Sequence, residues 1–368
     1  MRRIVFHAPS LGGGGAERVV VLIANELASR GHEVILFTWN AAGPNALLVS
    51  AQVQLVDLRL PIRGGGFGKL ATLGGLWRSA KFLRAARPDA VYSAPEFANL
   101  LIAVALVMAG SSARFFPSFH AAASLPSERL GARLAVLMSR LVAYRATKAV
   151  AVSRGVGRDI AARGISLTKI AVIGNPVALP TSSEQISLDH VSALADMGNG
   201  PVIVSAGRLV AVKDHRTLLA AFAELRRHRP ARLVIFGEGP LRAALIAYAA
   251  ELDIQGSVLF PGYVNDPACC FAVADVFVLS STSEGFGNVL VEAMAAGVPV
   301  VSTDAPHGPR EILADGRFGL LVAVGDALAL AAAIEATLDH PLSADCLKAR
   351  AADYDIRTVG GLYEALLT

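Results

Sequence analysis

The fold is decided by one stretch, SSTSEGFGNVLVEAMAAGVPVVSTDAPHGPREIL, which runs from Ser280 to Leu313. A short apolar run, Ala274 to Ser280, leads into its glycines and has the composition of a buried parallel strand. An amphipathic segment follows from Asn288 to Ala296, Gly297 is a helix stop, and a second apolar run covers Pro299 to Ser302. The order strand, glycine loop, helix, strand predicts one unit of an open α/β sheet.

The same stretch carries two carboxylates, Glu284 and Glu292, with seven residues between them. Free backbone N–H groups of the glycine loop and of the helix N-terminus form a ready anion site. A phosphate bound there, with carboxylates on either side to accept hydrogen bonds from hydroxyls, would suit a sugar nucleotide. The other interpretation is a helix cap beside one exposed glutamate, and these residues alone do not separate the two.

The start of the chain predicts a second unit of the same kind. A strand at Ile4 to His7 is followed by LGGGGAER, a helix at Val19 to Ser29 and a strand at Glu33 to Thr38, as in a Rossmann-like domain. A dinucleotide cofactor would require an acidic residue near the end of that second strand, and the sequence there reads FTWN. We therefore expect no cofactor.

The chain of 368 residues is long for one domain. Alternating strands and helices resume at Val202 after a polar, linker-like stretch, residues 181–200. We expect an N-terminal domain over residues 1–178, a C-terminal domain over 179–350, and a helical tail over 351–368 that packs back on the first domain. Two doubly wound domains would face a cleft, the usual place for a ligand.

Composition limits the location of the protein. The three cysteines form neither a metal-ligand pattern nor a disulfide framework, which fits a reducing compartment. The beginning, MRRIVFHAPSLGGGG, has too short an apolar run for a signal peptide. The most apolar stretch, Ala98 to Ala109, has 12 residues where a membrane span needs roughly 20, and it predicts a core helix. We expect a cytoplasmic protein.

Charge is divided unevenly along the chain. Residues 1–178 hold 21 lysines and arginines against 8 acids, a net +13, and residues 179–368 hold 13 against 22, a net −9. The basic half predicts peripheral contact with an anionic membrane at the inner face of the cytoplasmic membrane. Its candidate helices are Leu76 to Ala86, with Arg78, Lys81 and Arg84 beside Trp77, and the segment 124–148. Ordinary solvated helix faces are the alternative, and nucleic acid is excluded by the scarcity of aromatic residues, 6%.

Further polar residues stand where strands are expected to end, which is where open α/β sheets bind ligands. Arg208 and Lys213 follow the strand Val202 to Ala206, and two cations there would stabilise a diphosphate leaving group without a metal. His120 follows a strand at Arg114 to Phe119. The loops FGEG and GYV, residues 236–239 and 262–264, are placed to hold a nucleoside base. The only Asp-x-Asp lies in the C-terminal tail, and we predict no metal site.

The second half resembles the retaining glycosyltransferases of family 4, which have the GT-B fold of two Rossmann-like domains. The resemblance is carried by SAGRLVAVKDH, LVIFGEGPLR, VLFPGYV, ADVFVLSSTSEGFGNVLVEAMAAGVPVVS and GPREIL, nearly the whole of residues 202–326. The first half is similar more loosely, through SLGGGGAERVV, SFHAAAS, AVSRGV and VIGNPV. GGAER and GPREIL resemble bacterial enzymes that build surface polysaccharides, lipopolysaccharide or lipid-linked oligosaccharides.

The resemblance implies retaining transfer of a sugar from a nucleotide-diphosphate donor to an acceptor hydroxyl. Arg208 and Lys213 would bind the donor diphosphate. Glu284 would contact the donor sugar, and Glu292 the ribose. His120 would lie near the reacting carbon and the acceptor, and Glu17, at a position that varies in the family, is a weaker acceptor-side candidate. The other donor contacts implied are Gly14, Gly15, Gly237, Gly239, Tyr263, Val264, Gly285, Phe286, Gly287, Asn288 and Val289.

Two alternatives remain open. A UDP-N-acetylhexosamine epimerase or hydrolase of the same fold would require extra acid–base carboxylates, and the first half has only eight acids. A non-enzymatic module that binds anionic lipid would rest on the basic half alone. Among transferases we favour a UDP-sugar donor over a GDP-sugar and a lipid-linked or polysaccharide acceptor. The motifs do not encode which sugar is moved.

Overall fold

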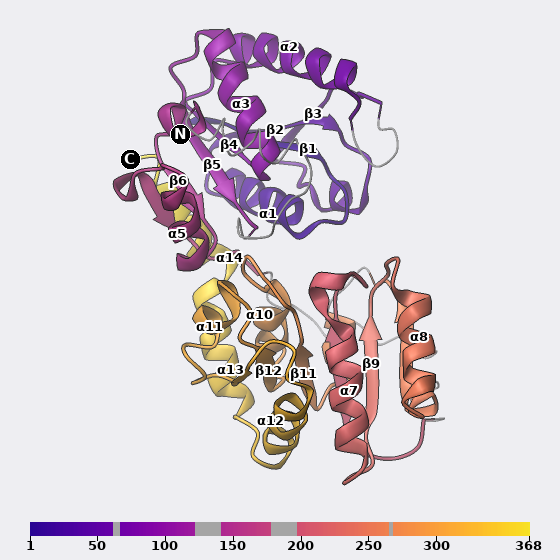
Figure 1. Cartoon of the computed structure of the whole chain (residues 1–368). Helices are drawn as coiled ribbons and strands as arrows, with labels where there is room; N and C mark the ends of the chain where they lie inside the picture. Colours follow the sequence, from indigo (N-terminus) through magenta and orange to yellow (C-terminus); the bar gives the residue numbers. More distant parts are fainter. Residues whose placement is uncertain (62–66, 122–140, 178–196, 265–267) are drawn as a thin grey trace. The chain divides into compact units, whose positions relative to one another are not determined.

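The computed structural model describes residues 1–61, 67–121, 141–177, 197–264 and 268–368 (Figure 1). Within it the chain divides into two compact units. Unit 1 comprises Met1–Pro176 together with Ile356–Thr368, and unit 2 comprises Val177–Asp355. The C-terminal residues that belong to unit 1 thus begin at Ile356, five residues later than the tail expected from the sequence.

Unit 1 is built on a parallel sheet of seven strands in the order β3-β2-β1-β4-β5-β6-β7. The strands are β1 Arg3–Ser10, β2 Glu33–Asn40, β3 Gln54–Asp57, β4 Ala90–Ser93, β5 Arg114–Phe119, β6 Ala149–Ala151 and β7 Ile170–Val172. Helices α2 Lys69–Ala86 and α3 Glu96–Ala109 lie on one side of this sheet and α1 Gly15–Ser29 on the other (Figure 1). The other helices among the described residues of unit 1 are η1 Pro44–Leu48, α5 Arg154–Ala162, η2 Leu167–Lys169 and α14 Ile356–Ala365.

The core of unit 1 follows from the two-residue period of strand β1. Ile4, Phe6 and Ala8 point to the side of α1 and belong to one buried cluster. Stacked rings extend that cluster, since Phe6 lies 4.9 Å from Tyr92, and Tyr92 lies 4.7 Å from Phe116. His7 points to the opposite face, where it is buried beside the rings of Phe37 and Trp39.

Helix α14 is bound to unit 1 by hydrogen bonds and ion pairs. The hydroxyl of Tyr92 donates to the carbonyl of Tyr363 over 2.8 Å. Arg30 pairs with Glu364 over 3.0 Å, and Arg114 donates to the carbonyl of Leu367 over 2.6 Å. The last residues of the chain therefore complete the core that the first residues begin.

Unit 2 has a parallel sheet of six strands in the order β10-β9-β8-β11-β12-β13. The strands are β8 Val202–Ala206, β9 Arg232–Phe236, β10 Val258–Gly262, β11 Val276–Leu279, β12 Val300–Thr303 and β13 Leu320–Val322. The helices are η3 Ala211–Lys213, α7 His215–Arg226, α8 Arg242–Glu251, η4 Gln255–Ser257, α9 Ala268–Phe271, α10 Asn288–Ala295, α11 Gly308–Ile312, α12 Ala327–Asp339, α13 Ala344–Ala351 and η5 Ala352–Tyr354.

Each sheet reverses its strand order once, between β1 and β4 in unit 1 and between β8 and β11 in unit 2. Ligands of doubly wound sheets bind beyond the carboxyl ends of the strands at such a reversal. The loops that follow β8 and β11 are therefore the first place to look for a site in unit 2. In unit 1 the corresponding loop is the glycine run between β1 and α1.

The prediction of two doubly wound α/β domains is confirmed, and most elements differ from their predicted bounds by a few residues. One expectation was wrong: the helix expected to begin at Leu76 is α2, which begins seven residues earlier, at Lys69. Gly75 is buried in that helix, and a Cβ atom there would lie 2.7 Å from the ring of Trp39. This glycine serves a close packing contact, so it does not mark a loop.

Two sequence expectations fall partly outside the described residues. Residues 124–140 of the amphipathic helix expected within 124–148 lie outside the described residues. So do residues 181–196 of the linker expected at 181–200. The apolar run Ala98 to Ala109 is confirmed as a core helix, with Ile102 and Leu106 fully buried. Across the part of the chain that the structure describes, every helix is too short or too polar to traverse a lipid bilayer.

Candidate active site

Lys213 and Glu284 meet beyond the carboxyl ends of β8 and β11, where the strand order of unit 2 reverses. The Nζ atom of Lys213 lies 2.5 Å from Oε1 of Glu284, and their side chains are only 19% and 11% exposed. The hydroxyl of Ser281 donates to the same oxygen over 2.7 Å. Two donors therefore fix the Glu284 carboxylate, and both bonds end on Oε1.

The loops that carry this ion pair are tied together through their backbones. The Ser280 hydroxyl donates to the carbonyl of Lys213 over 2.9 Å, and the Thr282 amide donates to that of Val212 over 2.8 Å. From β12, the hydroxyl of Thr303 donates to the carbonyl of Ser281 over 2.6 Å. The position of the two charges thus depends on three adjacent strands.

Arg208 lies in the same loop after β8, five residues before Lys213, and its side chain is exposed. Lys213 itself ends a single 3₁₀ turn, η3, which gives way to α7 at Asp214. Asp214 adopts a left-handed conformation, with φ of 43°, and its carboxylate caps α7 by accepting from the Thr217 amide. The two cations are therefore held by a short, tightly turned segment at the end of β8.

Gly237 and Gly239 allow the loop after β9 to pack directly on the loop after β8. A Cβ atom at either position would overlap a carbonyl oxygen, that of Gly207 for Gly237 and that of Leu209 for Gly239. The amide of Leu209 donates to the carbonyl of Glu238 over 2.9 Å, which closes the contact. The packing of the two loops therefore requires glycine at both positions, independently of any contact with a ligand. Beyond the next strand, Tyr263 is 58% exposed and Val264 is half-buried.

Helix α10 begins at Asn288 and carries Val289 in its first turn and Glu292 one turn on. Its N-cap, Gly287, has φ of 106°, a conformation that favours glycine. The preceding loop, which includes Gly285, is held from the β12 side, since Gly308 packs so closely on the carbonyl of Phe286 that a Cβ atom would overlap it. Gly297 ends the helix with φ of 80°, as predicted.

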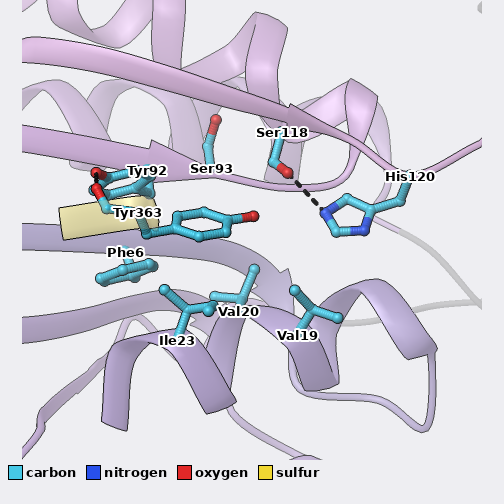
Figure 2. Close-up of a pocket in the computed structure, with 9 residues that line it drawn as sticks. All are labelled: Phe6, Val19, Val20, Ile23, Tyr92, Ser93, Ser118, His120 and Tyr363. Carbon is cyan, nitrogen blue, oxygen red and sulfur yellow. Dashed lines mark hydrogen bonds between the residues drawn. The ribbon is translucent and has the colours of Figure 1, made fainter. Parts of the chain in front are cut away.

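In unit 1, His120 stands directly after β5, beside the start of α1. Its Nε2 atom lies 2.9 Å from the hydroxyl of Ser118 (Figure 2). Burial lowers the pKa of His120 to about 4, and a side-chain hydrogen bond with Asn175 opposes that shift only in part. The imidazole is therefore neutral at neutral pH, able to accept a proton or hydrogen bond at one nitrogen.

A small cavity of about 10 Å³ lies beneath His120, no larger than one water molecule. Figure 2 shows it between the ring of Tyr363, which comes from α14, and the apolar side chains of α1. Burial raises the pKa of Tyr363 to about 12, and its hydroxyl hydrogen-bonds Ser118. A chain of contacts thus runs from the C-terminal helix through Ser118 to His120.

The glycine loop between β1 and α1 places Gly14 as the N-cap of α1, Gly15 as its first residue and Glu17 in its first turn. The Glu17 carboxylate folds back over Gly14, where a Cβ atom would overlap it. Asn45 holds the loop from below, because its Nδ2 donates to the carbonyls of both Gly12 and Gly14. The backbone of the loop is thus fixed by a buried side chain from η1.

The structure therefore gathers the predicted residues into two groups, one in each unit. The unit 2 group consists of the loops that carry Arg208, Lys213, Glu284 and the start of α10, while the unit 1 group consists of His120 and the glycine loop. Sequence reasoning missed Ser281, Thr303 and Asn45, which hold these groups in place. Serine and asparagine are common in loops, and only Asn45, within a Gly-Pro-Asn turn, carried a local signal. Among the described residues, no cluster of three His, Cys, Asp or Glu side chains is suited to a metal ion.

Two family models match the sequence. The one described as Glycosyl transferases group 1 matches residues 191–354, and the one described as Glycosyltransferase Family 4 matches residues 13–179. Between them they cover both halves of the chain.

Curated relatives point to the same enzymes. The chain is 30% identical over 323 residues to the lipopolysaccharide core biosynthesis glycosyltransferase LpsE of Rhizobium meliloti, a match that covers 88% of this chain and 85% of that protein. It is 38% identical over 160 residues to N-acetylgalactosamine-N,N'-diacetylbacillosaminyl-diphospho-undecaprenol 4-alpha-N-acetylgalactosaminyltransferase of Campylobacter jejuni. The latter match spans 44% of this chain and 42% of that relative.

Solved structures resemble the whole chain. HepE of Anabaena, in complex with UDP and glucose, has a TM-score of 0.83 at 23% identity, covering 100% of this chain and 99% of its own. The apo form of the lipopolysaccharide outer core galactosyltransferase WaaB has a TM-score of 0.74 at 20% identity, with coverage of 100% and 99%. These likenesses establish the GT-B fold.

Proposed function

Since this chain belongs to the glycosyltransferases of group 1 and family 4, we propose that it transfers a sugar, with retention, from a UDP-sugar to a hydroxyl of a lipid-linked or polysaccharide acceptor. The observation that carries the proposal is the Lys213–Glu284 pair, which puts a cation and a sugar-binding carboxylate side by side at the strand reversal. A sugar-nucleotide donor is bound by positive charge at its phosphates and by hydrogen-bond acceptors at its sugar. Lys213 supplies the first and Glu284 the second.

In the proposed reaction the C1–oxygen bond to the diphosphate breaks and a bond forms between C1 and the acceptor oxygen on the same face. The acceptor proton passes to the leaving diphosphate. Lys213 and Arg208 stabilise the negative charge that develops on the diphosphate, so no metal ion is required. The first amides of α10, at Asn288 and Val289, add the positive end of a helix dipole to the same charge.

The remaining donor contacts follow from position. Glu284 accepts hydrogen bonds from sugar hydroxyls, and Glu292, one turn along α10, accepts them from the ribose. The exposed ring of Tyr263 offers a surface for the base. Gly14 and Gly15, in the glycine loop of unit 1, are proposed as further contacts of the donor phosphates.

His120 is proposed to contact the reacting end of the acceptor. Its pKa of about 4 keeps the ring neutral, so it accepts a hydrogen bond from a hydroxyl without placing a second positive charge near the sugar. Glu17, which folds over Gly14, is a second candidate for the acceptor side.

Relatives inform the choice of substrates. The names of two relatives specify a lipopolysaccharide core and a diphospho-undecaprenol-linked acceptor, and one structural neighbour was solved with UDP. Another relative is named as GDP-mannose-dependent, so the base is a choice within this group. An acceptor carried by a membrane lipid would place this protein at the cytoplasmic face of a membrane, in peripheral contact through its basic unit.

The test is turnover with a panel of UDP- and GDP-sugars, with EDTA present and with lipid extract or core oligosaccharide as acceptor. We expect UDP release that depends on acceptor, and a product whose anomeric proton coupling matches that of the donor. Glu284→Gln should abolish transfer, while Arg227→Gln, a change to a side chain that is 73% exposed in unit 2, should not. An absence of nucleotide release with every donor would refute the proposal. Release of an epimerised sugar nucleotide without acceptor would instead support the epimerase alternative.

A further inference from the structure

Helix α2 carries apolar side chains on two opposite faces. One face packs inward: Ser79 accepts a hydrogen bond from the Trp39 indole over 2.9 Å, Phe82 stacks on Phe37 at 4.5 Å, and Leu83 is buried. The other face carries Leu70, Leu73 and Trp77, which are 87%, 64% and 59% exposed. Large apolar side chains at this level of exposure contribute little to the packing of the described residues of unit 1.

The exposed residues form a continuous stripe. At about 100° per residue, Leu70, Leu73 and Trp77 fall within an arc of about 60°, and the centre of the buried face lies on the opposite side of the helix. Lys81 continues the stripe one turn further, with its Nζ 5.6 Å from the centre of the Trp77 ring. We call Leu70, Leu73, Trp77 and the cations around them, Lys69, Arg78, Lys81 and Arg84, the α2 surface.

Charge on this helix has one sign. Residues 67–87 contain five lysines and arginines and no acid. Lys69 and Arg78 lie on the two sides of the stripe, while Lys81 and Arg84 lie at its C-terminal end. Arg84 is fixed by hydrogen bonds to the carbonyls of Met108 and Ala109, so its charge stays beside the stripe.

The apolar stripe and the positive charge of the α2 surface together indicate which kind of partner it binds. A second copy of this chain placed on the α2 surface would bring cations against cations, which opposes dimerisation through this face. An exposed apolar stripe with tryptophan, bordered by lysine and arginine, matches a helix that lies in the plane of an anionic bilayer, with its apolar side chains below the headgroups.

We propose that the α2 surface is the membrane-docking site of this protein and that its partner is the anionic lipid surface of a bilayer. This site would provide the membrane contact of the proposed function. It rests on that function in one respect, because a lipid-linked acceptor would require such contact. Trp77 and the two leucines enter the headgroup region, and the flanking cations face anionic headgroups.

The experiment uses the full chain and vesicles of phosphatidylcholine, alone or mixed with phosphatidylglycerol, in a co-sedimentation assay. The chain has two tryptophans, and Trp39 is fully buried, so a blue shift of emission on mixing reports Trp77. We expect binding to the mixed vesicles, accompanied by this shift and weakened by salt.

Three variants separate the contributions. Changing Leu70, Leu73 and Trp77 together to Ser should lower vesicle affinity by at least about 100-fold, as expected when three apolar side chains are lost. Lys69→Gln with Lys81→Gln should lower it by about five-fold per cation. The matched control changes three other exposed residues of unit 1, Leu47, Leu167 and Leu362, to Ser and should bind as the wild type does.

The proposal is overturned if the wild type does not bind mixed vesicles, if binding is unaffected by the stripe variant, or if pure phosphatidylcholine binds equally well. A wild-type dimer that the stripe variant converts to monomer would identify a second copy as the occupant. Transfer to a detergent-dispersed acceptor is measured in parallel. Vesicle binding without transfer would refute the proposed function alone, and transfer without vesicle binding would refute the docking site alone.

Discussion

Lys213 and Glu284 come from loops 71 residues apart, yet Nζ of the lysine lies 2.5 Å from Oε1 of the glutamate. Both side chains are largely removed from solvent, and each needs the other to be stable there. The pair is also where the proposed donor would bind, so the same two charges would serve both the fold and the proposed reaction. Their removal should affect both.

Replacing Lys213 by Ala should leave the Glu284 carboxylate with one donor, Ser281, in a partly buried place. We expect the free energy of unfolding of unit 2 to fall by about 1–3 kcal/mol, the range for a polar group that loses its partner. Loss of the cation from the diphosphate should lower kcat/KM by about 100-fold. Urea titration and nucleotide-release kinetics measure the two effects. Normal turnover in the variant would show that Lys213 is structural only.

Replacing Gly308 by Ala should displace the loop before α10. The added Cβ atom would overlap the carbonyl of Phe286, and such overpacking costs about 1–3 kcal/mol. The melting temperature and donor affinity should therefore fall together. Gly256→Ala is the control, because nothing lies within 4 Å of its Cβ position. Equal melting temperatures for the two variants would contradict the packing described for Gly308.

Replacing Ser118 by Ala should remove the hydroxyl that contacts Nε2 of His120 over 2.9 Å. If His120 acts on the acceptor, the ring loses its fixed tautomer and orientation, and kcat should fall by about ten-fold while donor KM is unchanged. Ser118→Thr keeps a hydroxyl and should restore most of the rate. A rise in donor KM at constant kcat would place Ser118 in donor binding instead.

Acid should destabilise the folded chain between pH 6.5 and pH 4. Burial lowers the pKa of His7, His120 and His215 to about 4, against 6.5 when exposed. Below pH 6.5 these histidines bind protons in the unfolded chain but stay neutral in the folded chain. Each histidine therefore lowers the free energy of unfolding by up to about 1.4 kcal/mol per pH unit until its folded pKa is reached. Above pH 6.5 this loss vanishes.

The histidine contribution is measured by urea titration at pH 7.5 and pH 5. His7→Asn retains a donor for the carbonyl of Phe37, to which Nδ1 now bonds over 3.0 Å, and it should reduce the acid sensitivity of unit 1. His228→Asn, at a side chain that is 63% exposed, should not. An unchanged acid response in the His7 variant would refute the role of its burial.

Local sequence was sufficient for most of the fold. Apolar runs such as Val276–Leu279 and Val202–Val204 are buried on both faces, and buried parallel strands have that composition wherever they occur. Gly297 ends α10 because a left-handed residue favours glycine, whatever surrounds it. The start of α2 was misread, since the reason for Gly75 is the ring of Trp39, 36 positions earlier in the printed sequence.

The sequence by itself determined which residues carry charge and where each strand ends and a loop begins. Lys213, Glu284 and His120 were therefore identified as residues that follow strand ends. Only the tertiary structure decided which of them meet. Ser281 and Thr303 fix the glutamate loop, and Asn45 fixes the glycine loop, through contacts between loops distant in sequence. No local pattern encodes such contacts, because they depend on the order in which strands lie in the sheet. The sequence likewise drew attention to Trp77 and the cations beside it, but only the structure showed that Leu70 and Leu73 lie with Trp77 on the exposed face of α2.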